Sequence, residues 1–392
     1  QTLAIDYSET VKGGITVNNT GADLTVTEMT AGGDLANISL ATITTGSVLI
    51  DRIAAEEDSV TITAAAAGTG SIEESAVDAA ADIIAGTIDL DAPNGIGALN
   101  SIEMVGGTTI DADTTAAAAH IALSNVSDRD TTLQAISTTG ADANITIAQA
   151  GSGTLNAASA ITTTDGDIAI TSADSDIQLT TVTAGTDGNI NVTSTIASIS
   201  QAAGTIQAVD GGVALTAGQD VSVVAVDANA NTMSGNTVAI KINADRTVTV
   251  AAGSTGLVAV DGTEELNIDI DPIDIAINSA VTANGNVTGT ASNNILVAAG
   301  VTVTADQDSD GAGNVQFTAD DDLSGSGRFA MGAGSTLTGE NLTITAHDVT
   351  ADSLTADRDG SGNGTVTVTA ANDATFNNAV LAGNLIGTID IT

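Results

Sequence analysis

The stretch from Ile145 to Val192 reads ITIAQAGSGTLNAASAITTTDGDIAITSADSDIQLTTVTAGTDGNINV, and its pattern predicts the fold. Apolar and polar residues alternate there in short bursts, and Gly, Asn, Asp and Ser gather between the bursts. Alternation with a period of two is typical of strands with one buried face, and the intervening residue types favour turns. The stretch therefore predicts a series of short strands joined by tight turns.

The first residues of these bursts return at a nearly constant interval. The bursts at Ile145, Ile168, Ile190, Val213 and Val238 follow one another after 23, 22, 23 and 25 positions. A unit of roughly 20 to 25 residues cannot bury an apolar face alone, so it must stack on copies of itself. The sequence predicts an all-β fold, a parallel β-helix or β-solenoid with two or three strands per coil. We expect a right-handed coil, because parallel crossovers nearly always take that hand.

The regularity of the bursts also predicts how the chain is organised. Residues 111–392 carry them regularly, whereas residues 1–110 form a less regular part of the solenoid, with alanine-rich stretches that predict a loop or one short helix. Pro272 ends an acidic alternating run, and proline interrupts a strand ladder, which predicts a kink near residues 263–273. Both ends of the chain read as uncapped strands, which predicts self-association into fibres, end to end or laterally, or a segment of a longer rod.

Composition limits the class of protein and its partners. The 392 residues include 49 acidic and 7 basic side chains, and the formal net charge of -42 makes nucleic acid and anionic membranes poor partners. The hydrophobic 42% is almost entirely aliphatic, and β-branched side chains of this kind fill a narrow, repeating interior. The chain has no cysteine, which excludes disulfides and is compatible with secretion. No apolar run is long enough for membrane insertion as a helix.

The phrase DQDSDGAGN at residues 306–314 is the most specific local pattern. Asp306, Asp308 and Asp310 alternate before a glycine, as do the first three ligands of an EF-hand calcium loop. The match then ends, because the twelfth position of the loop is Phe317 rather than Glu. Calcium coordination and a simple turn made of Asp and Gly both remain open interpretations.

A shorter version of the phrase, DRDGSGNG, occupies residues 357–364 and is also followed by an alternating Thr-Val strand. Asp357 and Asp359 are its candidate metal ligands, and the same two interpretations apply to them. Calcium is the one cofactor that the sequence suggests.

Catalysis has little support in the sequence. Asp320-Asp321-Asp322 could supply paired carboxylates, as β-helical polysaccharide hydrolases require. Sugar clefts, however, use aromatic platforms, and lyases of acidic polysaccharides use Lys or Arg, and this chain has few of any of them. His120 and His347 lie in no nucleophile motif. We therefore expect no catalytic residues and no enzyme activity, with a carbohydrate-active β-helix enzyme as the remote alternative.

The repeats resemble those of a known group of proteins. GDIAITS at residues 166–172 and AGQDVSV at residues 217–223 resemble repeat units of filamentous-haemagglutinin-type exoproteins. The phrase at residues 304–319 resembles units of very long bacterial adhesins, and the resemblance covers most of residues 110–392. It implies a right-handed β-helical rod that is exported to the bacterial surface and acts in attachment, in a matrix or in a filament.

These patterns predict a non-catalytic structural or adhesive rod, extracellular or at a microbial cell surface. It would be a stalk segment of a long adhesin or a self-assembling filament subunit. The expected partners are further copies of the chain and host, surface or polysaccharide contacts. The alternative is a calcium-dependent binding module, in which ions held by the Asp loops stiffen the rod.

Overall fold

The computed structural model describes residues 2–7, 13–65, 68–75, 77–78, 80–106, 109–228, 238–252, 256–259, 265–268, 273–322, 324–361, 363–382 and 388–391. Contacts divide the chain into two compact units, unit 1 (Gln1–Thr195) and unit 2 (Ile196–Thr392). Strand pairing is continuous at residue 110, where the sequence predicts the end of the less regular part: Ile110 pairs with Ile88 in the preceding coil and with Leu133 in the next. The kink expected near residues 263–273 falls mainly on 263–264 and 269–272, which lie outside the described residues.

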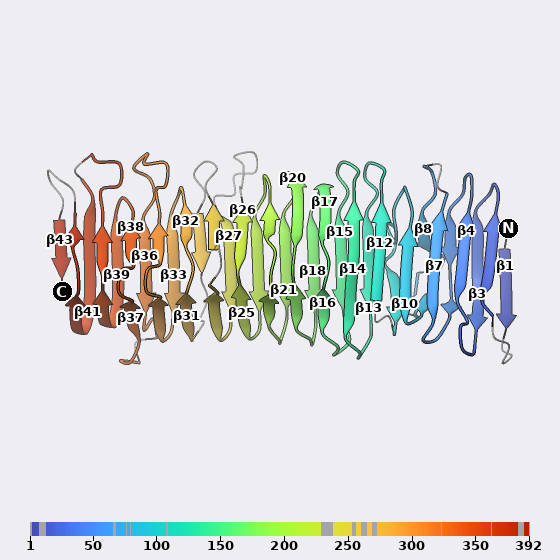
Figure 1. Cartoon of the computed structure of the whole chain (residues 1–392), viewed down its shortest axis with the longest axis horizontal. Coiled ribbons are helices and arrows are strands. Elements are labelled where there is room, and N and C mark those ends of the chain that lie inside the picture. The colour runs from blue at the N-terminus through green and yellow to red at the C-terminus, as the bar shows by residue number, and fades with distance from the viewer. Residues whose placement is uncertain are drawn as a thin grey trace. The chain divides into compact units, whose positions relative to one another are not determined.

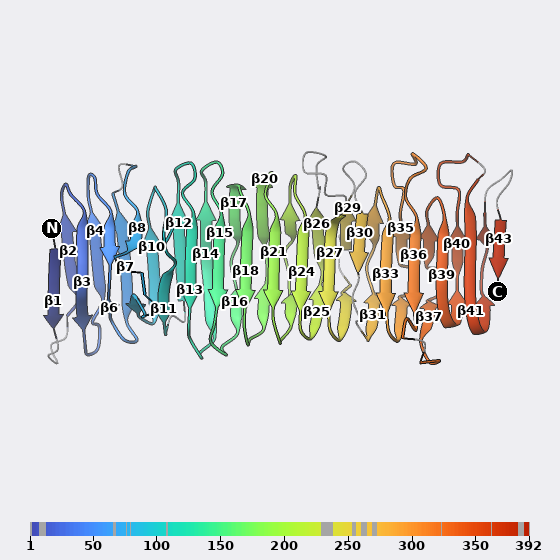
Figure 2. The same ribbon diagram turned by 180° about the vertical axis from the view of Figure 1, so that it is seen from behind.

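The described residues form strands and no helix, and the pairings between successive coils are parallel (Figures 1 and 2). The predicted all-β solenoid is thereby confirmed. Where the alanine-rich stretches of the first 110 residues are described, they form the end of a strand, irregular bends and a two-residue strand, and no helix. No helix long and apolar enough to cross a membrane occurs among the described residues.

Strands of successive coils pair into stacks, and unit 1 contains one stack that runs through the whole unit (Figure 2). Its strands are β2 (Ile15–Asn19), β4 (Ile38–Thr42), β7 (Ser59–Ala64), β10 (Thr87–Asp91), β12 (Thr109–Thr114), β14 (Thr131–Thr138), β17 (Ile161–Asp165) and β20 (Val182–Thr186). The remaining strands of unit 1 are β1 (Thr2–Tyr7), β3 (Leu24–Ala31), β5 (Val48–Ile50), β6 (Ile53–Ala54), β8 (Ile72–Glu74), β9 (Ile83–Ile84), β11 (Ile102–Val105), β13 (Ile121–Asn125), β15 (Ile145–Gln149), β16 (Leu155–Ala157), β18 (Ile168–Ser172), β19 (Ile177–Leu179) and β21 (Ile190–Ser194).

The described strands of unit 2 form three stacks. The first contains β24 (Val213–Ala217), β27 (Val238–Ala244), β30 (Glu265–Ile268), β33 (Val287–Ala291), β36 (Val315–Ala319), β39 (Leu342–Ala351), β41 (Thr365–Phe376) and β43 (Thr388–Ile391). The second contains β22 (Ile199–Gln201), β25 (Asp220–Val223), β28 (Thr247–Val250), β31 (Asp274–Ile277), β34 (Asn294–Val297) and β37 (Arg328–Met331), and it continues in the second halves of β39 and β41. The third contains β23 (Ile206–Ala208), β26 (Ala225–Ala228), β29 (Gly256–Ala259), β32 (Val281–Ala283), β35 (Thr302–Thr304), β38 (Thr336–Thr338), β40 (Ser353–Thr355) and β42 (Val380–Leu381).

Aliphatic side chains at the inward positions of the strands stack on their counterparts in the next coil. Ile121, Ile145, Ile168 and Ile190 pair in register, and all four are fully buried. The predicted steps from Ile145 to Ile168 and from Ile168 to Ile190 are therefore confirmed. Burial of such columns is the main source of free energy that holds the coils together.

The predicted step from Val213 to Val238 is wrong by two residues. Val213 pairs with Ile240, and the register of β27 shifts between Val238 and Ile240. Both residues fit a period of two, so alternation alone cannot distinguish them.

Coils in unit 2 also depart from the expected 20 to 25 residues. Val315 pairs with Val287, 28 positions earlier, and Phe329 pairs with Ile295, 34 positions earlier. Loops inserted at the corners lengthen these coils and leave the stacks intact. The only two aromatic rings in contact among the described residues belong to this region: Phe317 and Phe329 stack with their centroids 5.7 Å apart.

Polar side chains at the corners connect one coil to the next. His120 Nδ1 accepts a hydrogen bond from the Asn144 N–H at 3.0 Å, and Asn144 Oδ1 accepts one from the Asp167 N–H at 2.8 Å. Asp167 Oδ1 in turn accepts from the Asn189 N–H at 2.8 Å. Each acceptor stands directly before an inward isoleucine, so the corner series repeats with the coil, and His120 has a structural partner.

Candidate metal centre

Three corner loops of unit 2 share the sequence pattern Asp-X-Asp-X-X-Gly-X-Gly. We name them loop A (residues 306–313), loop B (residues 320–327) and loop C (residues 357–364). Loops A and C lie on the same edge of unit 2, beside β35–β36 and β40–β41, whereas loop B lies on the opposite edge before β37 (Figure 2). The sequence predicts candidate ligands in loops A and C, and in loop B only a carboxylate pair.

The first Asp and the last Gly of the pattern build each loop in the same way. The first Asp has a left-handed backbone, with φ of 56° at Asp306, 63° at Asp320 and 70° at Asp357. Asp tolerates this region better than most residues because its side chain bonds to the local backbone. At the last position of loop A, a Cβ on Gly313 would lie 2.1 Å from the Asp306 nitrogen, so only glycine fits. A Cβ on the corresponding glycine would lie 2.5 Å from the Asp320 nitrogen in loop B and 2.1 Å from the Asp357 nitrogen in loop C.

In loop A the Asp306 side chain is 0% exposed and lies inside the loop. Asp306 Oδ1 accepts hydrogen bonds from the N–H groups of Asp310 (2.9 Å) and Gly311 (3.0 Å). Burial raises the pKa of the Asp306 carboxyl, and the nearby Asp310 carboxyl acts in the same direction, against these two hydrogen bonds. Oxygens of Asp306, Asp308 and Asp310 lie within 4.8 Å of one another.

Loop B shows the simple turn that the same pattern can make. Asp320 Oδ1 accepts from the Ser324 hydroxyl at 2.9 Å and from the Gly325 N–H at 3.1 Å, and Oδ2 also accepts from Gly325 at 3.2 Å. Burial acts to raise the pKa of Asp320, but these hydrogen bonds hold it below the ordinary value. The Asp320 carboxylate is thus satisfied within its own loop, unlike that of Asp306.

In loop C, Asp357 is half-buried and Asp359 is exposed. Asp359 Oδ1 accepts from the Ser361 N–H at 2.7 Å, which lowers the pKa of Asp359. Oxygens of Asp357 and Asp359 lie within 4.8 Å of an oxygen of Glu340, a residue outside the loop. Burial is the main cause that raises the pKa of Glu340. The negative charge of Asp359 raises it further, and Asp357 and Asp306 add smaller effects in the same direction.

The two groups of carboxylates have the chemistry of a site for a hard cation. Calcium binds carboxylate oxygens at about 2.3–2.6 Å, so two oxygens on one ion lie no more than about 5 Å apart. Within each group the oxygens lie within 4.8 Å of one another, inside that limit. All five Asp residues predicted from the sequence, Asp306, Asp308, Asp310, Asp357 and Asp359, belong to one of the two groups.

Glu340 is the member that the sequence analysis missed. It stands alone after Gly339 in a short corner, and no local spacing connects it to either loop. The signal for it is the stacking of coils: its N–H donates to Gly313 O at 2.7 Å, and its carbonyl accepts from the Asp357 N–H at 3.0 Å. Only the coil register reveals these contacts.

Comparison of the chain with protein-family models, with curated proteins and with solved structures finds no match.

A third group of carboxylates, in unit 1, was not predicted. Oxygens of Glu74, Asp82 and Glu103 lie within 4.8 Å of one another, and Asp82 is only 2% exposed. Asp82 Oδ2 accepts from the Glu103 N–H at 2.9 Å, and Glu74 Oε1 accepts from the Asp78 N–H at 2.8 Å. Burial, together with the neighbouring Glu103 and Glu74 carboxyls, raises the pKa of Asp82 to about 8. A proton on Asp82 at neutral pH removes one of the three negative charges of this group, while Glu103 Oε2 stays buried and accepts no hydrogen bond.

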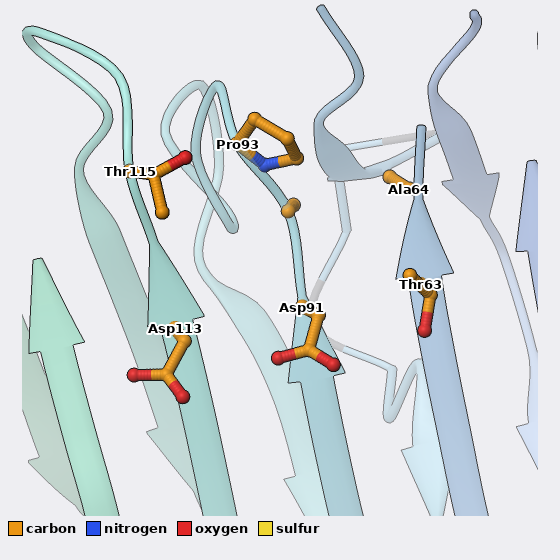
Figure 3. A pocket seen from close by; sticks show the side chains of 7 residues that line it. Thr63, Ala64, Asp91, Pro93, Asp113 and Thr115 are labelled. Atoms are coloured by element: carbon orange, nitrogen blue, oxygen red, sulfur yellow. The ribbon is translucent and has the colours of Figure 1, made fainter. Parts of the chain in front are cut away.

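A cavity of about 240 Å³ lies at the ends of β7, β10 and β12, lined by Thr63, Ala64, Asp91, Ala92, Pro93, Asp113 and Thr115 (Figure 3). Asp91 and Asp113 are register partners on neighbouring strands. Burial and the surrounding carboxyls raise the pKa of Asp91. The lining holds a carboxylate pair but no Lys, Arg or aromatic side chain, so it lacks the sugar-binding groups named above for a carbohydrate-active enzyme.

Proposed function

We propose that the chain is a non-catalytic structural or adhesive rod of a microbial cell surface, located outside the cell. It would serve as a stalk segment of a long adhesin or as a subunit of a self-assembling filament. The observation that carries the proposal is the stacking in register of parallel strands throughout each unit. Such a fold extends by adding coils and suits a protein whose task is to bridge distance.

The chemistry of the surface supports the same proposal. A net charge of -42 keeps such a chain soluble and away from anionic partners, and a chain without cysteine needs no oxidative step to fold after export. The expected partners are further copies of the chain and surface polysaccharides or host surfaces.

Immunogold labelling of the producing cells tests the proposed location. Antibodies raised against the purified chain should label intact cells, and gold in lines leading away from the envelope would identify a filament. The control is the same labelling after permeabilisation. Label that appears only in permeabilised cells would refute a surface role.

A calcium-dependent binding module is the second candidate, favoured by the two carboxylate groups around loops A and C. In this case cations would set the stiffness of the rod or its contacts with acidic polysaccharides. Binding of the chain to polysaccharide from its own cells, in calcium and in chelator, separates this candidate from a passive stalk.

A further inference from the structure

Loops A and C contact each other across the coil that separates them. Loop A follows β35 and loop C follows β40, while β38 of the intervening coil ends in the short Gly339-Glu340 corner. An Arg358 guanidinium nitrogen donates to Gln307 Oε1 at 3.2 Å, which links the two loops directly. A Cβ on Gly311 would lie 3.0 Å from Asp359 Oδ2, so the loops are in close contact there as well. The Glu340 corner therefore lies between the two loops.

Two carboxylate oxygens at this place are buried and accept no hydrogen bond. They are Asp306 Oδ2 and Glu340 Oε2. Asp306 is 0% exposed and Glu340 is 8% exposed. A buried acceptor without a donor is costly, and the cost is greater for a charged group. Because Asp306 belongs to one carboxylate group and Glu340 to the other, a cation bound in each group would remove both costs.

We propose that Asp306, Asp308, Asp310, Glu340, Asp357 and Asp359 form a composite Ca²⁺ site, made of the two neighbouring carboxylate groups, that joins loops A and C across the Glu340 corner. Glu340 supplies the ligand that neither loop contains, and so couples three successive coils. The inference rests on the calcium-dependent candidate function, because both need a bound cation.

The ligand chemistry favours Ca²⁺ over Mg²⁺. All six side chains offer carboxylate oxygens, and Asp308, Asp310 and Asp359 are exposed, so their oxygens can adjust to the ion. Ca²⁺ accepts six to eight oxygens in irregular geometry, whereas Mg²⁺ requires a near-ideal octahedron. Loop B provides the internal comparison, since it has the same sequence pattern but satisfies its Asp320 carboxylate with N–H and O–H donors.

Calorimetric titration of the full chain with CaCl₂, after chelator treatment, tests the proposal. The variants are Glu340→Gln and Asp306→Asn, and Asp320→Asn in loop B is the matched control. We expect the wild-type chain and Asp320→Asn to bind alike, and the other two variants to bind at least about tenfold more weakly. Thermal unfolding provides a second readout: Ca²⁺ should raise the Tm of the wild-type chain but much less that of Glu340→Gln.

Without Ca²⁺, Glu340→Gln should unfold at the wild-type Tm or above it, because the substitution removes a buried charge. A lower Tm without Ca²⁺, together with unchanged Ca²⁺ affinity, would make Glu340 a purely structural residue. Wild-type binding that Glu340→Gln leaves intact would overturn the composite site, while the calcium-dependent candidate would survive. No binding by the wild-type chain would overturn both.

Discussion

The Asp82 carboxyl shows how stacking decides the chemistry of a single residue. Its neighbour Glu103 lies on β11, which pairs with β9 from the next coil, and its neighbour Glu74 ends β8, eight residues before it in the same coil. Burial and these carboxyls raise its pKa from 3.8 to about 8. In the unfolded chain the pKa returns to its ordinary value, so folding takes up a proton over this range.

This shift predicts a pH dependence of stability. Asp82 contributes stability that is fully present below about pH 4 and is lost as pH rises through about 8, because the buried group must then ionise. From about pH 5 to about pH 9 the free energy of unfolding should fall, and Asp82→Asn should reduce that fall by about 1–3 kcal/mol.

Urea denaturation followed by circular dichroism across this pH range measures the effect. Asp128→Asn is the control, because hydrogen bonds from Ser152 lower the pKa of Asp128, which stays ionised throughout the range. An equal fall in Asp82→Asn and in the wild-type chain would show that Asp82 holds no proton.

Residues whose ligand spacing is local could be predicted from the sequence. The sequence predicts the candidate ligands Asp306, Asp308 and Asp310, and those of the shorter phrase at Asp357, because each set lies within one loop. Glu340 was not visible, because its partners lie one coil before and one coil after it and the coil lengths there vary. Asp82 was not predicted because Glu103, which accounts for part of its pKa shift, lies one coil after it.

At the corner between the third and first stacks of unit 2, hydrogen bonds between side chains connect the strands of successive coils. Successive strands of the first stack have a polar residue directly before them or at their first position: Asn286, Asn314 and Asn341 directly before, and Thr365 at the first position. Asn314 Oδ1 accepts from the N–H of Asn341 at 3.1 Å and from its side-chain amide at 2.8 Å, while Asn314 Nδ2 donates to Asn286 Oδ1 at 3.0 Å. This asparagine series ties four coils together at their corners.

Asn314→Ala should lower the free energy of unfolding by about 1–3 kcal/mol, because it removes three side-chain hydrogen bonds and leaves the Asn341 N–H without its acceptor. The matched control is Asn191→Ala, on an exposed position of β21, which should change the stability by less than about 0.5 kcal/mol. Urea denaturation in chelator compares the two. Equal stability of both variants would show that the corner series contributes nothing.

Strands could be predicted where apolar residues alternate with a period of two and are largely β-branched, as at Ile145, Ile168 and Ile190. The exact pairing could not be predicted where a bulge or a long corner intervened, as between Val213 and Ile240. A shift by two residues leaves the same face inward, so hydrophobic pattern alone does not fix the register there.

At the scale of the whole molecule, charge and stacking act against each other. A net charge of -42 makes neighbouring coils repel, while continuous strand pairing and aliphatic columns within each unit hold them together. The composition predicts both effects, through the excess of acidic residues and the high aliphatic content. It could not reveal that carboxylates gather between loops A and C, because that gathering depends on which coils carry long loops.

A stalk or filament of the kind that we propose must resist force along its length. Single-molecule force spectroscopy on the chain, held by tags at its two ends, measures this resistance. We predict cooperative unfolding peaks, because several coils must lose their parallel strand pairs together, and higher peaks in Ca²⁺ than in chelator for the wild-type chain but not for Glu340→Gln. Smooth extension without resisted steps in either buffer would contradict the account.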